Sequence, residues 1–217
     1  MRTHTELTYR KQQAWWAFNK HKRVLLNNHV SLGKRIRYFD ACVTPAILFG
    51  LSILPLRQKD LDMLDVLQRK MLRRIVGWRR KDGESWHDTM ERMNLRLSHG
   101  QSLHPCEDWS RLVLKFQWRY VFHLLQSYPS LWARILANHT AGSHADPHRV
   151  EIPHRRQARP HQRWDDYLQR FCRHLWPHIP GHWFEVLSHA DGLQAYEDLY
   201  VDFVRQAQKD DEENNVD

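Results

Sequence analysis

Residues that can ligate a metal lie closest together between Cys172 and His182, in the pattern C-x-H-x3-H-x3-H. Zinc binds cysteine thiolates and imidazoles in tetrahedral sites, so Cys172, His174, His178 and His182 form a candidate metal site. Prolines and a glycine interrupt the helix that would align these side chains, and 16 histidines are spread over the chain. Spacing alone does not establish the convergent geometry that four ligands need. We therefore expect neither a cofactor nor a metal, with this cluster as the one candidate.

Two further pairs of residues have types that occur in active sites. Asp165-Asp166 resembles the adjacent carboxylates that hold divalent metals for phosphoryl transfer. The pair falls in the first turn of an expected helix, where acids simply complement the helix dipole. His104 and Cys106 flank a proline, but the sequence places no acid to orient the imidazole, so we expect a buried or idle thiol. With no glycine-rich phosphate loop and no G-x-S-x-G pattern, we expect no catalysis by this chain.

The strongest chemical feature of the sequence is positive charge, a formal net charge of +8 over 217 residues. No acid lies between Asp65 and Asp82. The candidate binding residues, there and in the preceding helix, are Lys34, Arg35, Arg37, Arg69, Lys70, Arg73, Arg74, Arg79, Arg80 and Lys81. Such a cluster is either a solvated helix face or a phosphate-binding surface, because clustered Lys and Arg release counterions from a nucleic-acid backbone.

Four of these cations, Arg69, Lys70, Arg73 and Arg74, belong to one expected helix, between Leu61 and Trp78. Apolar residues recur in it at spacings of three and four, the pattern of an amphipathic helix laid on a core. Its polar residues are acidic at the start and basic at the end, the order that the helix dipole favours. Gly77 follows the last apolar pair, where a C-terminal cap would lie. The basic side chains should therefore project from the outer face of a buried helix.

The rest of the pattern predicts a mainly α protein, an irregular multi-helix bundle with a mobile basic linker and a disordered acidic C-terminal tail. Ser31 is the expected cap of a helix that Thr44-Pro45 should kink or end, and residues 98–105 have loop composition. Residues 46–54 fit a buried helical turn or a strand, and we favour the helix. The expected helices are 5–28, 32–43, 46–54, 61–78, 85–93, 107–126, 129–138, 162–175, 183–190 and 193–208. The expected regions are 1–100, a helical connection at 101–140, a Pro/His/Arg-rich linker at 141–161, a helical region at 162–208 and the tail at 209–217.

Composition bounds the cellular setting. Three widely separated cysteines argue against a disulfide framework and fit a reducing compartment. No apolar run approaches the roughly 20 residues that span a bilayer, and the N-terminus lacks the apolar core of a secretory signal. We expect an intracellular protein without membrane association.

The ten tryptophans should mostly pack helix against helix, with base stacking as the alternative. The expected packing residues are Trp109, Trp118, Trp132, Trp164, Trp176 and Trp183.

Several segments together resemble the region downstream of the polymerase palm in reverse transcriptases of non-LTR (LINE-type) retrotransposons. The most specific is FDACVTP at residues 39–45 with Gly50. The others are AWWAFNKHKRVLL at 14–26, LGKRIRY at 32–38, LQRKMLRRIVGW at 67–78, MERMNLRL at 90–97, WRYVFH at 118–123 and RP..RWDD at 159–166. Their order and spacing cover nearly the whole chain. Residues 1–100 would then correspond to the helical thumb.

The resemblance implies a function as well as a fold. In that family the thumb packs on the primer–template duplex through contacts with the sugar–phosphate backbone. By position, Lys34, Arg35, Arg37 and the cations of residues 69–74 would be the backbone contacts. The family's palm, with its metal-binding carboxylates, has no counterpart here, so we expect a non-catalytic remnant that binds duplex or RNA–DNA hybrid without sequence specificity. The alternatives are a helical protein–protein scaffold or functionless remnant and, behind both, a metal-dependent nuclease that uses the cluster at residues 172–182.

Overall fold

The computed structural model describes residues 3–126, 164–179, 181–189 and 192–213, and in these ranges the chain is mainly α-helical without a strand. This confirms the expected fold class. The helices fall into two units, which are described separately: residues 1–51 with 59–113, and residues 52–58 with 114–217. The predicted helix at 129–138, the linker at 141–161 and Trp132 lie outside the described residues.

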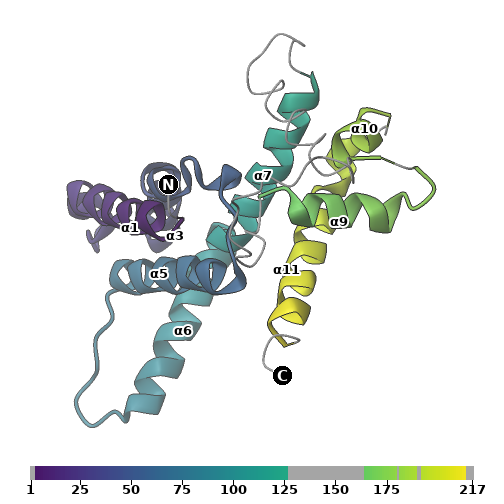
Figure 1. Ribbon diagram of the computed structural model, residues 1–217. Helices are drawn as coiled ribbons and strands as arrows, with labels where there is room; N and C mark the ends of the chain where they lie inside the picture. The colour runs from purple at the N-terminus through teal and green to yellow at the C-terminus, as the bar shows by residue number, and fades with distance from the viewer. Residues whose placement is uncertain (1–2, 127–163, 180, 190–191, 214–217) are drawn as a thin grey trace. The chain divides into compact units, whose positions relative to one another are not determined.

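The first unit contains α1 (Thr3–Lys20), α2 (Lys22–Leu25), α3 (Leu32–Cys42), α4 (Thr44–Leu48), most of α5 (Gln58–Val76), α6 (Trp86–Leu103) and the start of α7 (Trp109–Gln126). The boundary between the units falls within η1 (Leu51–Ile53). Helix α1 packs on α4, and α3 packs on both α4 and α6 (Figure 1). The predicted apolar stripe of α5 is buried, with Leu61, Leu64, Met71 and Ile75 fully inaccessible. Burial of this stripe leaves the opposite face of α5 to the cations.

Buried polar groups fix the start of α7 against α5. The Asp65 carboxylate accepts hydrogen bonds from the Ser110 backbone N–H (2.9 Å) and hydroxyl (2.7 Å). The Gln68 amide accepts from the Trp109 N–H (3.0 Å) and donates to the Glu107 carbonyl (2.9 Å). The Trp109 ring stacks on Phe39, and its indole N–H donates to the Thr44 hydroxyl (2.9 Å). The acids at the start of α5 thus contribute to packing as well as to the helix dipole.

The second unit contains the rest of α7 with α9 (Asp166–Leu175), α10 (Trp183–Ser188), η2 (Leu193–Tyr196) and α11 (Glu197–Glu213). Helix α9 packs on α10 and runs across α11 (Figure 1). The core of the second unit is aromatic: Trp118 stacks on Tyr200, and Phe171 lies edge-on to both rings. The buried Tyr200 hydroxyl donates to the Gln117 amide oxygen (2.9 Å).

Three predicted boundaries are wrong. The first helix divides at His21, whose ring shares a hydrogen bond with the Tyr38 hydroxyl (2.8 Å) and so ties the bend to α3. Helix α6 continues to Leu103, through the expected loop at 98–105, because Gly100 lets it approach α3 closely; a Cβ there would lie 2.7 Å from Leu32. Helix α11 extends to Glu213, so the first half of the acidic run is ordered.

Other local expectations hold with a change of detail. Ser31 occupies the N-cap position of α3 but makes no side-chain capping bond, and Pro45 lies in the first turn of α4. The residues after it form α4 and η1, which confirms helix over strand.

The stretch Leu32–Ile53 corrects our expectation about apolar runs, because by length and composition it could cross a membrane, with a mean hydropathy of 1.3. The chain divides it into α3, α4 and η1, and fully buried side chains such as Ile36 and Ile47 make it part of the first unit's core.

Candidate nucleic-acid interface

The outer face of α5 gathers four of the candidate cations. At about 100° per residue, Arg69, Lys70, Arg73 and Arg74 fall within an arc of about 140°, opposite the buried stripe. Arg69, Lys70 and Arg74 are exposed, whereas Arg73 is half-buried and its Nε donor has no hydrogen-bond partner among the described residues. The helix thus presents these charges on one face, as the sequence predicts.

The end of α5 is closed by the predicted glycine cap. Gly77 has φ +80°, the left-handed region that favours glycine. The Trp78 N–H donates to the Arg73 carbonyl (3.2 Å) and the Gly77 N–H to the Arg74 carbonyl (3.1 Å), the paired bonds of a Schellman motif. This turn places the Trp78 ring under the Arg73 guanidinium, 5.1 Å from carbon to centroid.

A chain of ring contacts then joins three helices. The Arg74 guanidinium lies 4.7 Å from the ring centroid of Trp15 on α1, and the rings of Trp78 and Trp86 are 6.3 Å apart. Together with the Arg73–Trp78 contact, these define a tryptophan–arginine ridge made of Trp15, Arg73, Arg74, Trp78 and Trp86. Because guanidinium groups bind the faces of indole rings, the ridge holds its two arginines in place while leaving their hydrogen-bond donors for a ligand.

The cations beside the ridge have no acidic partners of their own. Among the described residues, no ion pair involves Arg69, Lys70, Arg74, Arg79 or Lys81. The same is true of Lys34, Arg37, Arg73 and Arg80 in that part of the chain. The acids of the described residues therefore form no ion pairs with this face.

Glu84, a half-buried acid of the following loop, is paired with Arg92. Arg92 on α6 holds the Glu84 carboxylate with two hydrogen bonds (2.6 and 2.7 Å) and donates a third to the Arg79 carbonyl (2.8 Å). The bond from Arg92 lowers the pKa of Glu84 to about 2, helped by bonds from the Lys81 N–H and the Thr89 hydroxyl. This clasp fixes the path of the loop at residues 77–85 (Figure 1) and leaves its cations unpaired.

Arg35 does not belong to the candidate interface, which corrects the prediction. Its side chain is only 3% exposed, and its Nη1 donates to the Ile75 carbonyl (2.6 Å) and weakly to the Leu25 carbonyl (3.5 Å). Burial and the nearby Arg96 lower the pKa of Arg35. Arg35 therefore anchors the last turn of α5 to α2, a positioning role that residue type alone does not reveal.

The remaining predicted cations are exposed but separate from the ridge. Lys34 and Arg37 lie on the outer face of α3, and no hydrogen bond, ion pair or cation–π contact in the described chain joins them to α5. Arg79, Arg80 and Lys81 are exposed in the loop, where Arg80 Nε donates to the Glu84 carbonyl (2.7 Å).

Residue-by-residue charge reasoning missed the aromatic half of this face. Trp16 is 62% and Trp86 61% exposed, and the Lys20 ammonium lies 5.1 Å from the Trp16 ring centroid. The signal in the sequence was the interleaving of tryptophans with basic residues in AWWAFNK and GWRRK. By contrast, the prediction that tryptophans pack helices together is confirmed for Trp109, Trp118 and Trp183, each 2% exposed or less.

The candidate metal and catalytic residues are not brought together. In the described part of the chain no group of three or more His, Cys, Asp or Glu side chains could hold a metal ion. Cys172 is buried, which raises its pKa to about 12, while His174 and His178 are exposed. His182 is buried 4.0 Å from Asp165 and accepts a long bond from the Phe184 N–H (3.4 Å).

The two smaller pairs are structural as well. Asp165 is buried and accepts the indole N–H of Trp183 (3.1 Å), so its carboxylate supports the second unit's core. The structure does place an acid near His104, with Asp40 at 3.8 Å. Yet burial and the Asp40 charge raise the pKa of Cys106 to about 12, which keeps the thiol protonated and unreactive at neutral pH.

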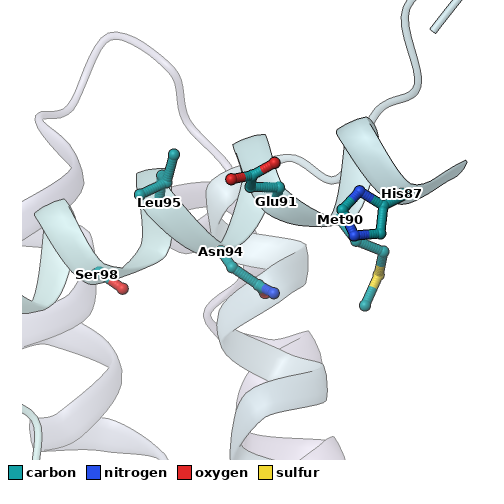
Figure 2. A pocket seen from close by; sticks show the side chains of 6 residues that line it. All are labelled: His87, Met90, Glu91, Asn94, Leu95 and Ser98. Atoms are coloured by element: carbon teal, nitrogen blue, oxygen red, sulfur yellow. The ribbon is translucent and has the colours of Figure 1, made fainter. Parts of the chain in front are cut away.

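One shallow cleft lies along α6, with a volume of about 410 Å³. Figure 2 shows that the side chains lining it all project from this helix. They are His87, Met90, Glu91, Asn94, Leu95 and Ser98.

Searches against protein-family models, curated proteins and solved structures found no match for this chain.

Proposed function

We propose that the first unit binds nucleic acid through its phosphate backbone, using the outer face of α5, the tryptophan–arginine ridge and the loop at residues 79–81. The observation that carries this proposal is the set of exposed cations on α5 and in the loop that form no ion pair among the described residues, while the charge of Glu84 is balanced by Arg92.

The ligand that matches this face is a polyanion of regular charge spacing. Each phosphate neutralised on duplex releases counterions and adds about −0.9 to the slope of log affinity against log salt. Four to six contacts from α5 and the loop would give a slope of about −4 to −5. Since phosphate contacts carry no sequence information, binding is non-specific and accepts RNA–DNA hybrid or duplex.

We further propose that the chain is a non-catalytic relative of the thumb and connecting region of non-LTR reverse transcriptases. The order of the matching segments supports this descent, and the helix that would touch primer–template duplex there is α5 here. In this proposal, binding is the activity that the described part of the chain retains.

The direct test reverses the charge of the exposed α5 cations. A hybrid duplex is titrated across a salt series with the wild type and with the triple variant Arg69→Glu, Lys70→Glu, Arg74→Glu. We expect a loss of about 100-fold or more at low salt and a slope reduced by about three. A matched control changes Arg173, Arg205 and Lys209 of the second unit to Glu, which gives the same net charge. Equal losses in both variants, or no loss in either, would overturn the proposal.

A protein–protein scaffold is the second candidate, and one observation favours it. Leu95 is 66% exposed beside the cleft on α6, where an apolar partner could dock. Retention on heparin that falls steeply with salt separates nucleic-acid binding from this alternative. Metal analysis of the purified protein tests the third candidate, a nuclease built on residues 172–182.

A further inference from the structure

We propose that Trp16 and Trp86 are stacking platforms for unpaired bases, so that the preferred ligand of this face carries a single-stranded segment. The proposal rests on the nucleic-acid binding proposed above and names the class of ligand. It goes beyond backbone contacts, because a tryptophan ring reads the presence of an unpaired base and a phosphate contact does not.

Exposure sets these two side chains apart. Trp16 and Trp86 expose 62% and 61% of their surface, whereas the other described tryptophans are buried or half-buried. Each exposed ring also has a defined neighbour: Lys20 lies over Trp16 at 5.1 Å, and Trp86 leans on Trp78 at an interplanar angle of 58°. These contacts limit the rotamers of the rings, so less entropy is lost when a base stacks on them.

The surroundings of the two rings resemble the sites with which proteins bind single-stranded nucleic acid. Trp15 and Trp86 form the two ends of the ridge, with Arg73 and Arg74 between them, and Trp16 follows Trp15 in α1, about 100° further around the helix. Proteins that bind single strands combine aromatic platforms for the bases with a cationic track for the phosphates. The ridge brings these two components together in the first unit.

Charge favours a nucleic acid over a protein partner at these rings. Lysine is depleted at protein interfaces, whereas Lys20 lies over the exposed Trp16 ring. Near Trp86, Arg92 balances the charge of Glu84, and Asp88 accepts a hydrogen bond from the Ser85 hydroxyl (2.6 Å) and stays exposed. The cations that contact the indoles, Lys20, Arg73 and Arg74, favour an anionic partner.

The test compares three ligands that share one RNA–DNA hybrid of about 16 base pairs: blunt-ended, with a single-stranded extension of about eight nucleotides, and with an abasic extension of the same backbone length. The wild type should prefer the extension that has bases over the abasic one by about 10-fold or more, because stacking contributes roughly 5-fold to 150-fold per base. Equal affinity for the two extensions overturns this inference.

Substitutions of Trp16 and Trp86 test whether these rings cause the preference for unpaired bases. The double variant Trp16→Ala, Trp86→Ala should lose the preference for unpaired bases and bind blunt hybrid less tightly by a smaller factor, with the salt slope unchanged because the α5 cations remain. The double variant Trp16→Phe, Trp86→Phe should keep most of the preference. Leu95→Ala removes an exposed apolar side chain on the far side of α6 and should change nothing. Retention of the preference in the double alanine variant, or its loss in Leu95→Ala, contradicts the proposal.

Failure of this inference is distinguishable from failure of the proposed function. If the wild type binds blunt hybrid and loses affinity in the Arg69, Lys70, Arg74 variant, but shows no preference for unpaired bases, only the stacking role is removed. If blunt hybrid and both extended ligands are all bound without salt dependence, the proposed function falls and the inference falls with it. Because both rings are exposed, their replacement should leave the fold intact, which circular dichroism verifies directly.

Discussion

The two units use the same residue types in opposite ways. In the second unit, cations pair with acids on α11: Lys115 with Asp198 (3.0 Å), Arg119 with Glu197 (2.7 Å) and Arg170 with Asp211 (2.7 Å). Its central tryptophans, Trp118 and Trp183, are buried. In the first unit, the cations of α5 and the following loop lack acidic partners, and two tryptophans are exposed. Pairing and burial, which composition does not show, therefore distinguish the two units and support the binding surface that we propose for the first.

The tryptophans provide the largest expected contrast. Trp183→Ala should lower the free energy of unfolding by about 3–5 kcal/mol, because it empties a fully buried site and leaves Asp165 without its indole donor. Trp86→Ala should change it by no more than about 0.5 kcal/mol, since that ring is mostly in water. Urea unfolding of both variants measures the difference. Comparable losses would contradict the division between packing and surface tryptophans.

Arg35 should behave like a residue of the core although it lies in a basic cluster. Arg35→Met leaves the buried Ile75 carbonyl without its donor and should lower stability by about 1.5–3 kcal/mol. Arg37→Met, two residues along on the outer face of α3, should have an effect within about 0.5 kcal/mol. Thermal unfolding of the pair checks this. If Arg37→Met proves the more harmful, the assignment of Arg35 as an anchor is wrong.

Removal of a paired cation in the second unit should affect stability, whereas removal of an unpaired cation in the first unit should affect affinity. Arg119→Gln breaks a largely exposed pair with Glu197 and should lower stability by up to about 1 kcal/mol without changing affinity for hybrid. Arg74→Gln should leave stability nearly unchanged and reduce affinity several-fold, roughly one phosphate contact. Parallel unfolding and titration of both variants make the comparison. A change in affinity from Arg119→Gln would contradict it.

The Glu84–Arg92 clasp predicts a smaller effect that depends on pH. Because the pKa of Glu84 is lowered to about 2, its contribution to stability is complete above the ordinary carboxyl pKa, near 4.5, and is lost as pH falls toward 2. Glu84→Gln should therefore be less stable than the wild type at pH 5, with the gap narrowing toward pH 2. Melting temperatures over this range test the sign. A gap that widens on acidification would rule out the clasp.

Much of the first unit could be predicted from local sequence. The stripe, the dipole order and the Gly77 cap of α5 are all encoded within about four turns of chain, so periodicity and capping rules were sufficient. The burial of Arg35 and the helical course of residues 98–103 depend on contacts between α3, α5 and α6, and nothing local signals them. For the same reason the Arg74–Trp15 contact, which joins α1 to α5, was outside the reach of charge counting.

At the acidic C-terminus, too, a contact between residues distant in sequence decides the local structure. Asp211 was expected in a tail without fixed structure, because a run of like charges repels itself. The Arg170 guanidinium (2.7 Å) and the Tyr167 hydroxyl (3.0 Å) on α9 bind its carboxylate and extend α11 through it. A partner distant in sequence thus decides whether a charged segment is ordered.

The central claim is that the unpaired cations of α5 bind phosphates, and one measurement tests it most directly. Affinity for a hybrid duplex is measured against salt concentration for the wild type, the Arg69, Lys70, Arg74 variant and the charge-matched Arg173, Arg205, Lys209 variant. The account predicts a slope of about −4 to −5 that falls by about three only when the α5 cations are reversed. A wild-type slope near zero, or the same slope in all three proteins, would contradict it.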